Sequence, residues 1–161
     1  MTKTNDIQVT KYSPQFYQDI EKETWTSISD IGKEIDGHIL TFEEYISIEK
    51  KHISAAFILL EEKEKFFIKK LEKSAYHTKY FPDENLKEFF DSVINEALFD
   101  IEMIEPIIKL ILRECLWCDI GTDDEECTIS FGYDYYMYFN SLFLTEDKKS
   151  RIRDLGLFVY D

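Results

Sequence analysis

Large apolar residues recur at a helical spacing through the middle of the chain. Four of them stand seven positions apart: Ile46, Ile53, Leu60 and Phe67. A seven-residue interval returns a side chain to the same face of an α-helix, and the Glu/Lys-rich positions in between suit a solvated face. Thr41 and Glu44 precede the series with the spacing of a capping box. The pattern therefore predicts one long helix from Thr41 to about Tyr76.

Two further helices are expected after this one. Residues 80–82 read Tyr-Phe-Pro and interrupt the long helix, so that a second helix would begin near Asp83. Its apolar face repeats with a helical period: Leu86, Phe89, Phe90, Val93, Ile94 and Ala97. A bend is predicted near residues 99–105, and Pro106 would then open another helix that reaches residues 112–114.

Beyond that point the pattern changes to the alternation of strands. Strands are expected where β-branched and aromatic residues concentrate: residues 115–120, 127–132, 133–141 and 157–160. The polar residues 121–126 predict a turn between the first two. Thr145 predicts the start of a short helix, which Gly156 would end. Near the N-terminus, Ile7 and Val9 suit a short edge strand.

These elements together predict an α+β fold. A helical N-terminal two-thirds would pack on a small, mostly antiparallel C-terminal sheet. The length of 161 residues suits a single domain over residues 1–161, and 44% hydrophobic with 32% charged residues is an ordinary globular composition. No apolar stretch approaches the roughly 20 residues that span a bilayer, and the N-terminus lacks the apolar region of a signal peptide. We therefore expect a cytoplasmic protein that does not bind membranes.

Charge is distributed unevenly along the chain. The formal net charge is −14, from 33 acidic and 19 basic residues. Residues 1–80 carry 12 basic and 14 acidic side chains, whereas residues 81–161 carry 7 and 19, which places a net charge of −12 in the second half. Such a chain is repelled by nucleic acids and anionic lipids and attracted to a basic partner. The alternative is a surface whose acidity only maintains solubility.

No motif in the sequence can be assigned to catalysis. P-loop, dinucleotide-binding, nucleophile-elbow and His-Glu-x-x-His patterns are missing, so we expect no enzymatic activity, no catalytic residues and no cofactor. Because acidic residues are abundant, a carboxylate-based enzyme stays open as an alternative. Cys115, Cys118 and Cys127 supply one ligand fewer than a zinc site requires, and we interpret them as reduced, buried residues, with metal and redox roles as alternatives. His52 is expected at the boundary of the helical core.

Two pairs of segments resemble a known class of proteins. One pair reads WTSISDIGK at residues 25–33 and LTFEEY at residues 40–45, and the other reads FGYDYYMY at residues 131–138 and GLFV at residues 156–159. These segments resemble small bacterial immunity proteins of polymorphic-toxin and contact-dependent growth inhibition systems. The resemblance implies a protein that binds one cognate toxin domain and blocks its active site, and such toxins are often nucleases with basic clefts. It does not identify the contacting residues.

The contacting residues are therefore predicted from their chemistry. An inhibitor of a basic cleft requires carboxylates where phosphates would lie, together with aromatic anchors. The acidic turn and the aromatic strand after it offer both, and in a strand Tyr133 and Tyr135 would share one face. Alternatively, most of these tyrosines pack the sheet. The candidate partner-binding residues are Asp123, Asp124, Glu125, Glu126, Tyr133, Asp134 and Tyr135, with Glu84, Glu88 and Asp91 on a second, helical face.

The leading hypothesis is an immunity protein that neutralises a cognate toxin domain, expected to be a nuclease, by occluding its basic active-site cleft. The partner would be that toxin domain and not a nucleic acid or a membrane. The alternative is an acidic adaptor or regulator that binds proteins without catalytic activity.

Overall fold

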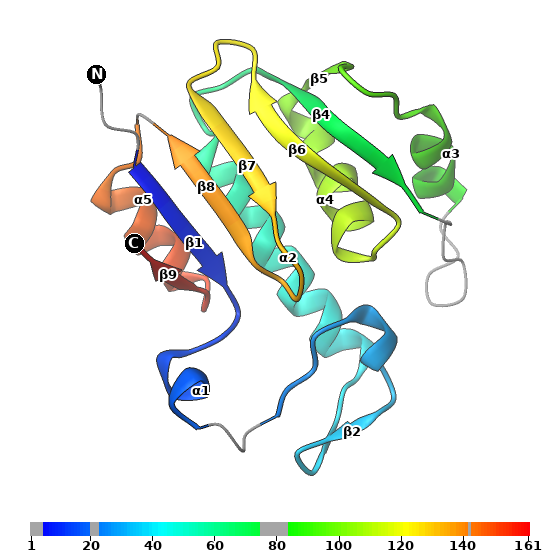
Figure 1. Ribbon diagram of the computed structural model, residues 1–161, viewed down its shortest axis with the longest axis vertical. Helices are drawn as coiled ribbons and strands as arrows, with labels where there is room; N and C mark the ends of the chain where they lie inside the picture. Colours follow the sequence, from blue (N-terminus) through cyan, green and yellow to red (C-terminus); the bar gives the residue numbers. More distant parts are fainter. Residues whose placement is uncertain (1–4, 20–22, 75–83, 142) are drawn as a thin grey trace.

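The computed structural model describes residues 5–19, 23–74, 84–141 and 143–161. Within these ranges, seven strands form one antiparallel sheet in the order β5-β4-β6-β7-β8-β1-β9, and helices lie against one of its faces (Figure 1). The strands are β1 (Asn5–Thr10), β4 (Lys65–Lys73), β5 (Leu98–Asp100), β6 (Leu116–Thr122), β7 (Cys127–Phe131), β8 (Met137–Ser141) and β9 (Phe158–Tyr160). The helices are α1 (Pro14–Gln18), α2 (Phe42–Leu59), α3 (Glu84–Ser92), α4 (Ile104–Leu112) and α5 (Glu146–Asp154). Two 3-10 turns (Ile28–Asp30 and Ile101–Met103) and a separate hairpin of β2 (Glu34–Ile35) and β3 (His38–Ile39) complete the fold.

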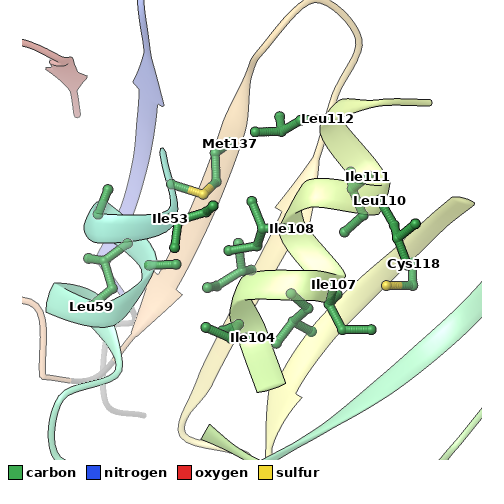
Figure 2. Packing of buried hydrophobic residues seen from close by; sticks show 14 of the residues in the cluster. Ile53, Leu59, Ile104, Ile107, Ile108, Leu110, Ile111, Leu112, Cys118 and Met137 are labelled. Atoms are coloured by element: carbon green, nitrogen blue, oxygen red, sulfur yellow. The ribbon is translucent and has the colours of Figure 1, made fainter. Parts of the chain in front are cut away.

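The hydrophobic core lies between the sheet and its helices. Strand side chains alternate between the two faces: in β7, Cys127 and Ile129 are buried, whereas Thr128 is exposed. Helix α4 is apolar nearly all round and is therefore central: Ile104, Ile107, Ile108, Leu110, Ile111 and Leu112 are buried (Figure 2). The opposite face of the sheet carries polar and aromatic side chains such as Tyr138, which is exposed.

The predicted confinement of the sheet to the C-terminal third is wrong. Strand β1 comes from the N-terminus and pairs with both β8 and β9, so it is not an edge strand. Strand β4 comes from the middle of the chain and pairs with β5 and β6. The fold is thus a mixed structure whose seven-stranded sheet draws on most of the chain, with helices interspersed between its strands.

The single long helix expected up to about Tyr76 is also wrong. Helix α2 begins at the expected capping box of Thr41 and Glu44 but ends at Leu59, and residues 65–73 are strand β4. Within β4, Phe66 and Ile68 are buried, whereas Lys65, Phe67 and Lys69 are more exposed, which is the period of a strand. Phe67 continues the seven-residue series only by coincidence. Strand pairing on both sides of β4 outweighs the helical preference of the neighbouring Glu and Lys residues.

The remaining elements differ mainly in their bounds. Helix α3 ends at Ser92, so that Ile94 is exposed, and α4 begins at Ile104 rather than at Pro106. The predicted break at residues 80–82 lies outside the described residues. Among those residues, no helix combines the length and the apolar character needed to cross a bilayer.

Candidate functional site

The predicted partner-binding residues fall at three separate places. The acidic residues 123–126 form the turn before β7, whereas residues 133–135 follow β7 at its other end. Helix α3 lies beyond β4 at the Lys73 end of that strand, where Lys73 Nζ donates to the carbonyl oxygen of Phe90 at 2.6 Å. Because Phe66 at the opposite end of β4 pairs with Thr122, α3 and the acidic turn occupy opposite ends of the sheet. The structure therefore does not unite these residues in one surface.

Two of the four acidic residues of the turn, Asp124 and Glu126, are engaged by a lysine from the segment before β4. Lys63 Nζ lies 2.5 Å from Asp124 Oδ2 and also donates to the Glu126 carboxylate. The Thr122 hydroxyl donates to Asp124 Oδ1 at 2.6 Å. Desolvation opposes the charged form of Asp124, but these hydrogen bonds outweigh it and hold its pKa well below the usual range. Only Asp123 and Glu125 of this turn are exposed without a role in the lysine-centred network.

The acidic face of α3 is exposed on the helix surface. Glu88 and Asp91 are exposed, and Asp91 forms an i,i+4 ion pair with Lys87 at 2.8 Å. Glu84 is the first residue of the helix. Such exposed pairs are weak and are screened by salt, so the charge of this face alone contributes little to binding.

The expected strand over residues 133–141 begins only at Met137. Residues 132–136 form a tight turn, in which Asp134 and Tyr135 adopt left-handed backbone conformations with φ of 62° and 68°. A Cβ at Gly132 would stand 3.0 Å from the Tyr138 ring, so a larger residue there would require that ring to shift. As a result, Tyr133 and Tyr135 do not share a face: Tyr133 is 82% exposed, and Tyr135 is 5% exposed.

Tyr135 anchors this turn in an aromatic cluster. Its ring packs edge-on against Trp25 and Tyr45, with ring centroids 5.1 and 6.3 Å away. Its carbonyl oxygen lies 3.4 Å from Nε2 of His52, whose Nδ1 lies 2.9 Å from the carbonyl oxygen of Ile48. His52 is fully buried rather than at the core boundary, and this burial lowers its pKa. The cluster therefore fixes the turn that presents Tyr133.

Three of the four segments that carry the resemblance to immunity proteins contribute to this cluster. Trp25 comes from WTSISDIGK, Tyr45 from LTFEEY and Tyr135 from FGYDYYMY. In the first segment, Ser27 and Asp30 form a capping box around the 3-10 turn. These segments thus have a structural role, because Trp25 and Tyr45 hold Tyr135 and with it the turn at residues 132–136.

Next to this turn the sheet opens. Strands β6 and β7 pair only at Ile120 with Ile129 and at Gly121 with Thr128, and their other ends diverge (Figure 1). Between the diverging ends lies an open hollow of about 370 Å³, which we call the β6–β7 notch. Its walls include Lys70, Glu72, Trp117, Asp119, Phe131 and Tyr133.

A smaller hollow adjoins the notch and shares Trp117, Phe131 and Tyr133 with it. This second hollow adds Glu114 and Asp134 to the rim, and both residues are exposed. The two hollows therefore flank one exposed tyrosine with aromatic walls and carboxylates.

Carboxylates dominate the charge around the notch. Glu72, Glu114, Asp119 and Asp134 line the two hollows, and Lys70 is the one basic residue among the described residues that line them. Lys70 Nζ lies 3.4 Å from Asp119 Oδ2, and the lysine side chain is 82% exposed. A pair this open is weak. Aromatic anchors beside carboxylates suit the binding of a cationic protein segment. Tyr133 and Asp134 were predicted here, whereas Trp117, Phe131 and Glu72 were not, because they meet only through the divergence of two strands.

The three cysteines are buried free thiols, as expected. Cys118 lies beneath the notch, and burial raises the pKa of its thiol to about 12. Cys127 Sγ lies 3.1 Å from the hydroxyl of Ser141. The described ranges contain no group of three metal-ligating side chains that could hold a metal ion.

Comparison of the chain with known protein families, with curated proteins and with solved structures finds no match.

Proposed function

We propose that this protein is an immunity protein: a stoichiometric, cytoplasmic inhibitor that binds a cognate basic toxin domain, expected to be a nuclease, and occludes its active-site cleft. The observation that carries this proposal is the β6–β7 notch with its aromatic walls and acidic rim. The protein acts by binding alone.

The notch has the composition of a tight interface. Binding energy in protein complexes is concentrated in aromatic and charged anchors, and Tyr133 stands exposed between two hollows. Because Tyr135 is packed between Trp25 and Tyr45, the turn that carries Tyr133 is ordered before the partner arrives. A pre-ordered anchor loses little conformational entropy on binding.

The charge of the chain favours a basic partner. The net charge of −14 attracts a cationic surface over a distance and raises the rate of encounter. Clefts that bind nucleic acid are basic, so carboxylates around the notch would stand where substrate phosphates stand. The resemblance of residues 25–33, 40–45 and 131–138 to immunity proteins supports the same partner class.

A rescue assay tests this proposal. The protein is expressed in cells that carry the toxin domain encoded beside its gene, and the purified pair is analysed by size-exclusion chromatography. We expect rescue of growth and a 1:1 complex. Tyr133→Ala should weaken rescue, whereas Phe143→Ala, which removes an exposed aromatic side chain beyond the other end of β8, should not.

Failure to rescue with both proteins folded would contradict the immunity proposal. The protein would then be better described as an acidic adaptor whose partner has to be found by other means.

A further inference from the structure

We infer that the β6–β7 notch is a receptor for an arginine side chain of the partner. The inference deepens the proposed function and rests on it, since it specifies the residue by which a basic protein partner is recognised.

The walls of the notch suit a flat cation. Trp117 and Phe131 are partly exposed, and Tyr133 is almost wholly exposed, so the surfaces of these rings are accessible to a side chain of a partner. A guanidinium group is planar and stacks on aromatic rings more readily than the compact ammonium group of lysine. Among the described residues, no lysine or arginine is found over these three rings.

The same chemistry is already used elsewhere in the molecule. Lys11 Nζ lies 4.1 Å from the ring centroid of Trp25 and 4.3 Å from that of Tyr12. That pair of rings is occupied by a cation of the chain itself. The rings of the notch are not, which leaves them for a cation from outside.

Lys70 marks where a cation rests in the free protein. Strand β4 has a bulge between Lys69 and Glu72, and Lys70 within it has a left-handed φ of 56°. From this bulge its ammonium group reaches Asp119, at 3.4 Å and nearly fully exposed. A contact this loose is readily exchanged.

A partner arginine would make a better contact at the same place. Its fork of N–H donors can bind both carboxylate oxygens of Asp119 at once, which Lys70 cannot. Glu72 stands on the same notch and adds a second carboxylate near the incoming charge. The arginine would thus displace Lys70 and stack between aromatic walls.

Other acidic surfaces are less suited to this role. Asp124 and Glu126 already share Lys63, and the exposed Asp91 of α3 already pairs with Lys87. Neither surface combines carboxylates with a hollow that three aromatic side chains line.

The test compares two probes of equal charge, hexa-arginine and hexa-lysine peptides, titrated into the purified protein by calorimetry. We expect hexa-arginine to bind about fivefold more tightly or better, because a guanidinium group stacks well on aromatic rings and binds both oxygens of a carboxylate. Tyr133→Ala should abolish this preference, whereas Phe143→Ala, which removes an exposed aromatic side chain beyond the other end of β8, should preserve it. Equal affinity for both peptides in the unmodified protein would overturn the inference.

The resident cation supplies a second, independent test. Lys70→Ala should strengthen hexa-arginine binding severalfold, because the competitor is removed. Lys87→Ala is the matched control, since it also removes an exposed lysine that is paired with an aspartate. If both variants strengthen binding equally, the effect is one of net charge and the inference is wrong.

The outcomes separate this inference from the proposed function. Rescue of growth without a preference for arginine would leave the immunity proposal standing and remove the notch as an arginine receptor. A preference for arginine without rescue would support the receptor and contradict the immunity proposal.

Discussion

Arg113 and Glu49 form a two-pronged ion pair inside the core, in which Arg113 Nε and Nη2 each donate to one carboxylate oxygen at 2.8 Å. The hydroxyl of Tyr45 donates to the same carboxylate at 2.9 Å. Glu49 is only 1% exposed, so its charge depends on these donors for compensation. The pair joins α2 to the C-terminal end of α4, beneath the aromatic cluster that holds Tyr135.

Removing one partner of this pair should be strongly destabilising. We expect Arg113→Ala to lower the free energy of unfolding by about 3–5 kcal/mol, because it leaves a buried carboxylate without its cation. Urea denaturation followed by circular dichroism measures the change. The double variant Glu49→Leu with Arg113→Leu should recover a large part of the loss, since it removes both charges. A cost below about 1 kcal/mol for Arg113→Ala would contradict this account.

Truncation of the two tyrosines of the turn should change the stability of the protein by very different amounts. Tyr135→Ala empties a buried aromatic site and should cost about 3–5 kcal/mol of stability. Tyr133→Ala removes a side chain that is exposed to solvent and should change stability by less than about 0.5 kcal/mol. Thermal and urea unfolding of both variants measure this contrast. Comparable losses would show that Tyr133 has a packing role, and its use as an anchor would have to be reconsidered.

Stability should depend on pH through Asp124. Its pKa is lowered in the folded state, so its contribution is fully present above the unfolded value of about 4 and is lost as pH falls through the folded pKa. Asp124→Asn should therefore cost up to about 1 kcal/mol near neutral pH, and this cost should shrink below about pH 4. Urea unfolding at several pH values measures the gap between the two proteins.

The neighbouring Asp123 provides the matched control for this pH experiment. Asp123→Asn alters an exposed carboxylate of the same turn and should cost less than about 0.5 kcal/mol at any pH. If the loss of unfolding free energy caused by Asp124→Asn stays constant with pH, the carboxylate contributes by its shape rather than by its charge.

Association with the proposed toxin domain should depend on salt mainly through its rate. Raising the ionic strength from about 0.05 to about 0.5 M should slow association by about tenfold or more, because long-range attraction is screened. Tyr133→Ala should instead accelerate dissociation, since a local contact is lost. Stopped-flow kinetics separate the two rates. An association rate that is independent of salt would argue against electrostatic steering.

Local signals in the sequence were sufficient where a short motif determines a short structure. Thr41 and Glu44 do form a capping box, and Thr145 does cap α5. Residues 127–131 form the expected strand, because alternation and β-branched residues agree there. In each case the controlling contacts lie within a few residues of one another.

The signals failed where distant segments determine the outcome. Residues 65–73 are a strand because β5 and β6 pair with them, and neither partner can be recognised from the helical spacing of Leu60 and Phe67. Residues 133–136 lack an Asn-Gly or Asp-Gly pair, so their tight turn resembled a continuing strand. The β6–β7 notch could not be foreseen at all, since it results from two strands ceasing to pair.

The short ladder between β6 and β7 lies between two groups of strands in the sheet. One group consists of β5, β4 and β6 and the other of β7, β8, β1 and β9, and the ladder between β6 and β7 has two residue pairs. The arginine proposed for the notch would contact Asp119 of the first group and Tyr133 beside the second. A bound arginine would therefore connect the two groups of strands. Because it binds only the folded sheet, it would raise the free energy of unfolding, and a more stable sheet would bind it better.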